Sequence, residues 1–323
     1  MNDSELQKEK QPKYHTIAFY NLENLFDTFD DKRTYDNDFL PSSERRWTER
    51  RYRKKLKKLG RVISQIGYKT SGIPPAIIGL AEVENRLVID DLISSKSLKN
   101  KSFDLVHFDS PDERGIDVAL IYNTELFIVE RTEVFSLALF DEFGERDYTR
   151  DILLVEGYLN NEKIYVLVNH WPSRREGVEI SEQKRLIASD KAIEIITAIK
   201  TENETAKIII MGDFNDNPQN KSIKQLVSSH DLYNPMESLL SYTRGSQSYR
   251  LEWNLFDQIL FSTNFFEYNP NGHSFSKADI FDKAFLKQYK GKYKGSPFRT
   301  YVGRKYKGGF SDHYPVYIHL KKL

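Results

Sequence analysis

Polar side chains that can bind a cation or move a proton stand beside several short apolar runs of the chain. They are Asn21 and Glu23 after HTIAFY, Glu82 after AIIGLA, His170 after KIYVLVN, Asp213 and Asn215 after KIIIMG, Asp257 at the start of FDQILF, and Asp312 and His313 before YPVYIHL. Functional sites of α/β sheets lie beyond the carboxyl ends of strands, and an antiparallel strand brings its start to the same edge. These groups are therefore expected to meet at one rim. Carboxylates, amides and imidazoles without any Cys favour Mg²⁺ or Mn²⁺ over zinc.

Short strands and helices must position these side chains. Strands are predicted at 15–20, 76–81, 103–108, 116–122, 152–159, 163–169, 207–212, 256–261 and 313–320. Helices are predicted at about 43–66, 181–200 and 219–229, the first capped by Ser42 or Ser43. Several strands are apolar at nearly every position, as strands covered on both faces are. Mixed strands and interspersed helices predict an α/β fold.

Three local patterns carry smaller predictions. Asn160 and Asn161 predict a hairpin, because Asn tolerates the positive φ of tight turns. Asn85 either supports the site or caps a helix that begins near Arg86. Phe265 and Phe266 are interpreted as the continuation of a strand, and less favourably as a membrane-binding hairpin.

Composition excludes several classes of protein. The absence of Cys excludes disulfide scaffolds, thiolate zinc sites, iron–sulfur clusters and a cysteine nucleophile. No run approaches the roughly 18 apolar residues of a membrane span, and the polar N-terminus is no signal peptide as written, so location stays open. We expect a flexible leader at 1–13, a single domain at 14–323 and a monomer without stable membrane insertion.

The net charge of +1 conceals two basic segments. Residues 44–61 hold ten basic and two acidic side chains, and residues 283–307 hold nine basic and no acidic ones. The rest of the chain is acidic. Two basic patches fit an anionic substrate held beside a carboxylate-rich site, and the alternative is that both are ordinary solvated surface.

Six segments, in this order, resemble the endonuclease/exonuclease/phosphatase superfamily. They are NLEN (21–24), AEVEN (81–85), NHWPSR (169–174), GDFND (212–216), LFDQIL (255–260) and SDHYPV (311–316). The superfamily includes deoxyribonucleases, abasic-site endonucleases, inositol-polyphosphate 5-phosphatases and neutral sphingomyelinases. The resemblance spans about 15–320 and implies a four-layer α/β/β/α sandwich with two packed mixed β-sheets.

The resemblance also implies a role for each site residue. The implied metal ligands are Glu82, Glu23 and Asp312. The implied catalytic residues are Asp213, Asn215, His313, Asp257 and His170. The implied contacts to the substrate phosphate are Arg150, His170 and Asn21.

The chemistry of these residues is consistent with hydrolysis of a phosphodiester by in-line attack of water. A divalent ion offsets the negative charge that repels a nucleophile. Asp213 can accept a proton from water or aim it, and Asn215 can hold that geometry. Asp257 favours the imidazolium form of His313, which predicts that His313 donates to the phosphate. Ala81 stands where many members have Gln, and no match to the catalytic Tyr of abasic-site enzymes is evident, which disfavours a specialised repair enzyme.

Three functions remain open from the sequence. The segment 281–310 interleaves eight aromatic residues with basic ones, as surfaces that bind single strands do, which favours a nuclease acting on DNA or RNA. The alternative in the same reaction class is a phosphatase or phosphodiesterase acting on a phosphoinositide, a phospholipid head group or another small ester. A catalytically silent binding module is the third, and the complete set of site residues argues against it.

Overall fold

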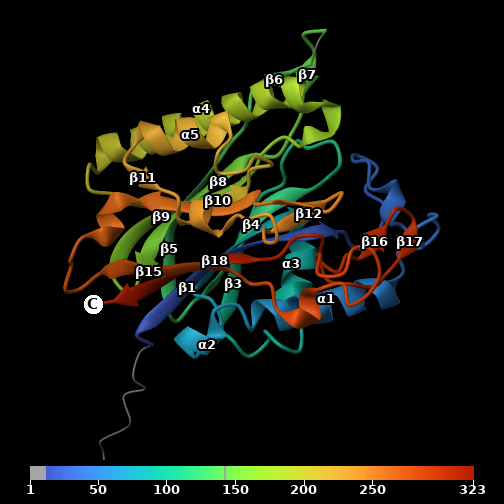
Figure 1. Cartoon of the computed structure of the whole chain (residues 1–323), viewed down its shortest axis with the longest axis horizontal. Coiled ribbons are helices and arrows are strands. Elements are labelled where there is room, and N and C mark those ends of the chain that lie inside the picture. Colours follow the sequence, from blue (N-terminus) through green and yellow to red (C-terminus); the bar gives the residue numbers. More distant parts are fainter. Residues whose placement is uncertain (1–11, 142) are drawn as a thin grey trace, which may run out of the picture.

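The computed structural model describes residues 12–141 and 143–323, and in it two six-stranded sheets stack face to face (Figure 1). The first sheet has the order β15 (His273–Ile280), β18 (Val316–Lys322), β1 (Tyr14–Leu25), β2 (Ile77–Val83), β4 (Asp117–Asn123) and β3 (Phe103–His107). The second has the order β11 (Leu232–Tyr233), β14 (Asp257–Ser262), β10 (Lys207–Asp213), β9 (Glu162–His170), β8 (Ile152–Leu159) and β5 (Phe127–Phe135). Both are mixed, because β1–β2 and β9–β10 are parallel and the other pairs are antiparallel. Most of the predicted leader, residues 1–11, lies outside the described residues.

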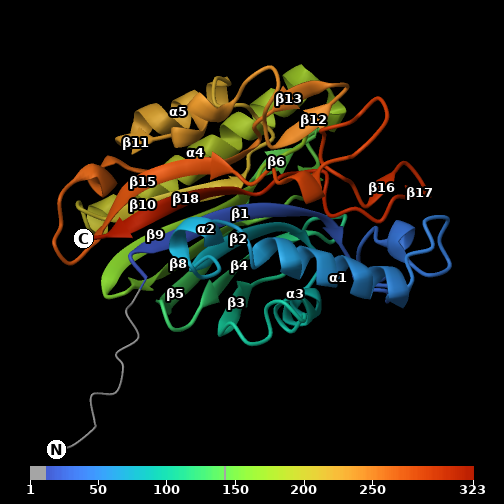
Figure 2. The ribbon, with the colours of Figure 1, turned by 60° about the horizontal axis from the view of Figure 1, so that its bottom comes forward.

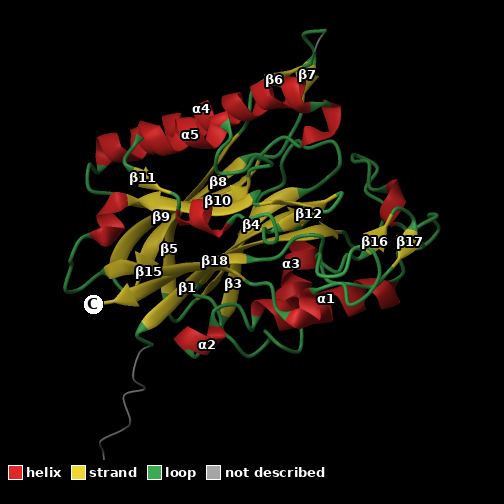
Figure 3. Cartoon of the chain, in the orientation of Figure 1, coloured by secondary structure: helices red, strands yellow, loops and turns green. Residues whose placement is uncertain are grey.

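Helices cover the outer faces of both sheets (Figures 1, 2 and 3). The first sheet is covered by α1 (Glu49–Ile63), α2 (Tyr68–Ser71) and α3 (Arg86–Ile93), and the second by α4 (Val178–Glu202) and α5 (Lys221–Ser229). Short ribbons extend from the sheets: β6 (Leu139–Phe140) with β7 (Arg146–Asp147), β12 (Gln247–Tyr249) with β13 (Glu252–Asn254), and β16 (Tyr301–Val302) with β17 (Lys305–Tyr306). The predicted α/β/β/α sandwich is confirmed. Among the described residues, no helix is long and apolar enough to cross a membrane.

The β10 strand shows why the chain forms two hydrophobic layers. Its side chains alternate between faces, so Ile209 and Met211 pack between the sheets whereas Ile208 and Ile210 pack under α4 and α5. Both faces of the strand are therefore apolar, which explains why its sequence shows no polar alternation.

Strand registers assemble part of the site. Asp213 at the end of β10 is the partner of His170 on parallel β9 and of Asp257 on antiparallel β14. Three motifs far apart in the sequence thus meet across neighbouring strands, as the strand-edge argument predicts.

All nine predicted strands are present, but within the two large sheets β5, β11 and β15 were not predicted. All three lie at the edge of a sheet: β11 has only two residues, β15 is largely polar, and polar residues at 130–133 interrupt the apolar residues of β5. The strand predicted at 313–320 begins later, at Val316, after Pro315, which has no N–H for a ladder. The hairpin at Asn160 and Asn161 is confirmed, with φ angles of 46° and 75°.

Two local predictions were wrong. The first helix begins at Glu49, not near residue 43, with Thr48 in the N-cap position; the Ser43 hydroxyl donates to carbonyls of Asp38 and Leu40 instead of capping it. Phe265 and Phe266 lie in a 3₁₀ turn (Thr263–Phe266) in which only Phe265 is buried. Asn85 does cap α3, because its side chain accepts from the Val88 N–H at 3.1 Å.

Ile210→Ala is expected to destabilise the fold by about 2–5 kcal/mol, because Ile210 is fully buried and truncation leaves a cavity. The same substitution at Ile128, which is 65% exposed on the same sheet, is the matched control and should cost less than about 1 kcal/mol. Urea unfolding measures both free energies. Equal losses would contradict the assignment of Ile210 to the core between β10 and the helices.

Candidate active site

Two adjacent β-bulges shape the rim where the predicted residues meet. The pairing of β1 with β2 shifts between Asn21 and Leu25, and the pairing of β2 with β4 shifts between Ala81 and Val83. Within these bulges Glu23, Asn24 and Glu82 have positive φ angles of 53°, 54° and 60°. Non-glycine residues rarely adopt this conformation, and bulges of this kind redirect side chains next to functional sites.

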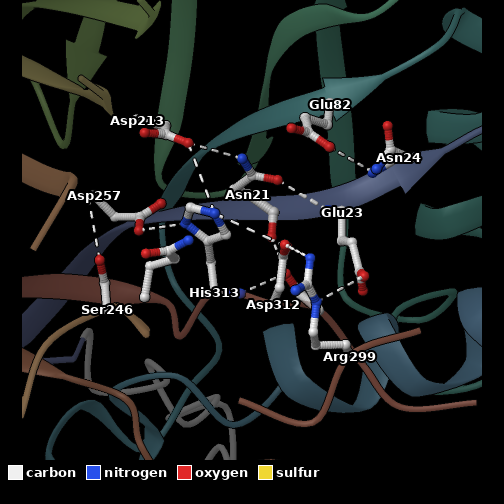
Figure 4. A network of polar contacts seen from close by, with 12 residues as sticks. Asn21, Glu23, Asn24, Glu82, Asp213, Ser246, Asp257, Arg299, Asp312 and His313 are labelled. Atoms are coloured by element: carbon white, nitrogen blue, oxygen red, sulfur yellow. Dashed lines mark hydrogen bonds and ion pairs between the residues drawn. The ribbon is translucent and has the colours of Figure 1, made fainter. Parts of the chain in front are cut away.

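Asp213 lies at the centre of the polar network (Figure 4). Its Oδ2 accepts a hydrogen bond from the Asn21 amide at 3.0 Å, and its Oδ1 accepts from the Asn215 N–H at 3.0 Å. The His170 and His313 Nε2 atoms each lie 3.9 Å from Oδ2. Burial raises the pKa of Asp213 to about 6, even though His313 opposes the shift.

His313 is held by Asp257, whose Oδ2 lies 2.7 Å from His313 Nδ1. Burial disfavours the charged imidazole, but the carboxylates of Asp257, Asp213 and Asp312 outweigh it, so the pKa of His313 lies well above its usual range. The Nδ1–Asp257 bond leaves Nε2 directed toward the centre of the site (Figure 4).

His170 has the opposite electrostatic environment. It is only 4% exposed, and neither ring nitrogen forms a hydrogen bond with another described residue. Burial and the nearby charges of Arg150 and Arg114 hold its pKa well below the usual value. Arg150 itself is fixed, because Nη1 donates to Asp112 at 2.9 Å and Nη2 to the Trp171 carbonyl at 3.0 Å.

Glu82 has a single hydrogen-bond partner within the described residues. Its Oε2 accepts from the Asn24 N–H at 2.8 Å, and within residues 12–141 and 143–323 it forms no ion pair closer than 4.0 Å. One of its oxygens therefore remains available to an incoming group.

Glu23 and Asp312, the other two predicted metal ligands, share a cation. Arg299 Nη2 lies 2.6 Å from Asp312, and Arg299 Nε lies 3.7 Å from Glu23. Glu23 Oε2 also accepts from the Thr300 N–H at 2.6 Å. Burial and the charge of Asp312 raise the pKa of Glu23 to about 7.

The structure brings some of the predicted residues closer together than others. Asp213, Asp257 and His313 each place a ligand atom within 4.8 Å of the others, whereas Glu23, Glu82 and Asp312 are not such a group among the described residues. Another group of this kind, His107, Asp109 and Asp117, was not predicted and lies on and near β3 and β4. Asn215 uses its amide to bond the Trp171 carbonyl at 2.9 Å.

Sequence reasoning missed Lys55 and Arg299. Lys55 is 2% exposed; its Nζ contacts the Glu23 carbonyl and donates to Thr300 Oγ1 at 2.9 Å. One signal was available, since Lys55 lies three residues after Tyr52 and four before Leu59, on the buried face of α1. Arg299 carries no such signal, because it lies in a loop among many basic residues.

Solved structures of three other proteins share this fold. TDP2 from Caenorhabditis elegans aligns over 95% of this chain and 97% of its own with 14% identity and a TM-score of 0.59. The mannosyl-6-phosphatase of Bacteroides thetaiotaomicron aligns over 95% and 99% with 16% identity and a TM-score of 0.59. TDP2 from D. rerio, solved with a single-strand DNA product, aligns over 95% and 99% with 14% identity and a TM-score of 0.56. At such low identity these likenesses establish the fold alone.

Comparison at the level of sequence gives the family. None of the curated proteins matches the chain. A model of the Endonuclease/Exonuclease/phosphatase family matches residues 16–322, nearly the whole chain and all six motifs. The chain therefore belongs to the endonuclease/exonuclease/phosphatase family of phosphate-ester hydrolases.

Proposed function

We propose that this protein is a metal-dependent phosphodiesterase that cleaves nucleic acid by in-line attack of an activated water. The observation that carries the proposal is the array of Asp213, Asn21, His313 and Asp257 beside the free oxygen of Glu82. At one edge of the sheets it combines a carboxylate base (Asp213), a protonated imidazole (His313) and a carboxylate without an ion pair (Glu82).

The donor atoms suit a hard divalent cation. Glu82, Glu23 and Asp312 all offer carboxylate oxygens, which Mg²⁺ and Mn²⁺ prefer, but Arg299 already pairs with Glu23 and Asp312, so Glu82 is the ligand that fits the ion best. Glu82 has an oxygen without a hydrogen bond in the described part of the chain, and Asp312 is one-fifth exposed. When bound, such an ion supplies charge neutralisation at the phosphoryl oxygens and the leaving group.

The protein side chains divide the remaining work. Asp213 accepts the proton of the attacking water, since it is fixed by Asn21 and by the Asn215 N–H. His313, kept as the imidazolium by Asp257, donates from Nε2 to a phosphoryl oxygen. His170 supplies a neutral ring N–H, and the charge of nearby Arg150 adds positive potential.

The basic segments favour nucleic acid as the substrate. Helix α1 packs against residues 281–310, and cation–π contacts join Arg51 to Tyr306 and Lys58 to Phe310, so much of that aromatic content is structural. Tyr289 and Tyr293 remain 69% and 45% exposed among Lys290, Lys292 and Lys294. Exposed rings beside lysines suit bases and phosphates of a single strand, and the D. rerio TDP2 structure holds a single-strand DNA product.

A substrate panel tests this proposal. With Mg²⁺ or Mn²⁺ the protein should cleave single-stranded oligonucleotides, RNA or plasmid, and chelation with EDTA should abolish cleavage. An inositol polyphosphate, sphingomyelin and mannose 6-phosphate are tested in parallel as small-ester substrates. Exclusive turnover of the small esters would refute the nuclease and select the phosphatase alternative.

Asp213→Asn should lower kcat by about 10²–10⁴-fold, because the amide cannot accept the proton. Its melting temperature should fall, because the amide has one acceptor oxygen where Asp213 accepts from both the Asn21 amide and the Asn215 N–H, so kcat is measured at a temperature where circular dichroism shows the variant to be folded. Asp109→Asn, at a side chain that is 74% exposed, is the matched control and should keep full activity. Wild-type kcat in Asp213→Asn would exclude Asp213 as the base.

The pKa shifts predict a defined pH dependence. Activity should rise with pH through about 6, as Asp213 ionises, whereas His313 should stay protonated well beyond the usual range of an imidazole, because Asp257 raises its pKa. Since folding raises the pKa of His313, its pairing stabilises the fold below about pH 6.5, and this contribution disappears as pH rises through the folded-state pKa. Asp257→Asn should lower the pKa of His313, measured by NMR of the imidazole nitrogens. A wild-type His313 that titrates near 6.5 would contradict the assignment.

A further inference from the structure

The segment between β15 and β18 touches the candidate site through Arg299 and Thr300. The Thr300 N–H donates to Glu23 Oε2 at 2.6 Å, and its hydroxyl accepts from the buried Lys55 ammonium at 2.9 Å. Thr300 is only 3% exposed. The backbone at this point is therefore held from two sides by groups that belong to the rim itself.

A second set of contacts fixes the same backbone from the other direction. Gly309 N–H donates to the Arg299 carbonyl at 3.0 Å, and Phe310 N–H donates to the Phe298 carbonyl at 2.6 Å. A Cβ at Gly309 would overlap the carbonyl oxygens of Phe298 and Arg299, so only glycine permits this close approach. The position of Arg299 is thus built into the fold.

The Arg299 side chain lies between the protein interior and solvent. Its guanidinium is paired with Asp312 at 2.6 Å, and Asp312 is the residue directly before His313 (Figure 4). The side chain is nevertheless 47% exposed, whereas the Glu23 and His313 side chains are only 6% and 8% exposed. A ligand that enters from solvent therefore meets Arg299 beside His313.

An ordinary surface ion pair is the simpler interpretation, and the structure offers an example for comparison. Arg304, on the same segment, pairs with Glu44, but these two side chains are 77% and 65% exposed. Arg299 differs from it, because its partner carboxylates belong to the site and its backbone is anchored by buried hydrogen bonds. Arginine also presents a planar fork of donors that matches phosphate oxygens.

We infer that Arg299 is a substrate-binding residue whose guanidinium, aimed by Asp312 and Glu23, contacts a phosphoryl oxygen beside His313. This inference rests on the proposed phosphoesterase function. It assigns to the 281–310 segment a direct contact with the reacting group, in addition to any contact with flanking parts of the substrate. Lys55 and Thr300 act through Arg299 and Glu23 and are positioning residues.

The test compares Arg299→Ala and Arg299→Lys with Arg304→Ala, the matched loss of an arginine from the same segment. Affinity for inorganic phosphate, measured by calorimetry in the full chain, should fall about 10- to 100-fold in Arg299→Ala, since a charge-assisted hydrogen bond is lost. With a phosphodiester substrate, kcat/KM should fall by a similar factor. Arg299→Lys should recover only part of the loss, and Arg304→Ala should remain within about twofold of the wild type.

Chemical rescue distinguishes a substrate-binding role of Arg299 from a purely structural role. Guanidinium ion at non-denaturing concentration should restore activity to Arg299→Ala, which it cannot do if the arginine only supports the fold. Unchanged phosphate affinity in Arg299→Ala, or a loss that guanidinium does not rescue, would overturn the inference. If the wild type hydrolyses no phosphate ester but Arg299→Ala still weakens phosphate binding, the assignment of Arg299 as a phosphate-binding residue stands and the proposed hydrolysis is wrong.

Discussion

The electrostatic balance of a buried acidic rim is the constraint on which the rest of the site depends. Asp213 and Asp257 are almost fully buried around His313, and Glu23 lies close to Asp312. Carboxylates cannot remain ionised together in a dry environment unless cations offset them. The chain provides such cations from three distant segments: the imidazolium of His313, the ammonium of Lys55 and the guanidinium of Arg299. Glu82 forms no ion pair within 4.0 Å among the described residues, although the charges of Arg114 and Lys55 act on it from farther away, and we therefore propose it as the principal ligand of a divalent ion.

The sheets supply the geometry that makes this balance possible. The registers of β9, β10 and β14 align His170, Asp213 and Asp257 at one edge, and the bulges of β1 and β2 place Glu23 and Glu82 nearby. Residues with strained positive φ angles persist only where surrounding structure holds them. Here the stacked sheets on one side and α1 on the other provide that support. The strained backbone therefore orients the acidic side chains of the site.

The sequence predicted the strands and the rim well because both follow from simple patterns. Apolar runs that end in Asp, Asn, Glu or His predict strand ends at a shared edge, and the order of the six motifs led to the correct family and sandwich. The pattern contained no information on Arg299, because its role depends on how a loop of about thirty residues closes onto Glu23 through Thr300 and Gly309. Lys55 was hidden for another reason: a lysine in a run of ten basic residues is normally solvated, and only its place on the apolar face of α1 marks it as buried. Edge strands β5, β11 and β15 were not predicted, because β11 is too short and polar residues interrupt the apolar pattern of the other two.

The most direct test of this account is the binding of Mn²⁺ to the metal-free protein, measured by electron paramagnetic resonance without any substrate. Saturable binding is expected in the wild type, and Glu82→Gln should lose at least about tenfold in affinity, because a carboxylate without an ion pair is replaced by a neutral amide. Glu125→Gln, at a carboxylate of the β4–β5 turn that bonds Ser102, should leave the affinity unchanged. Mn²⁺ binding that survives Glu82→Gln at wild-type strength would contradict the central claim that this acidic rim is built to hold a divalent cation.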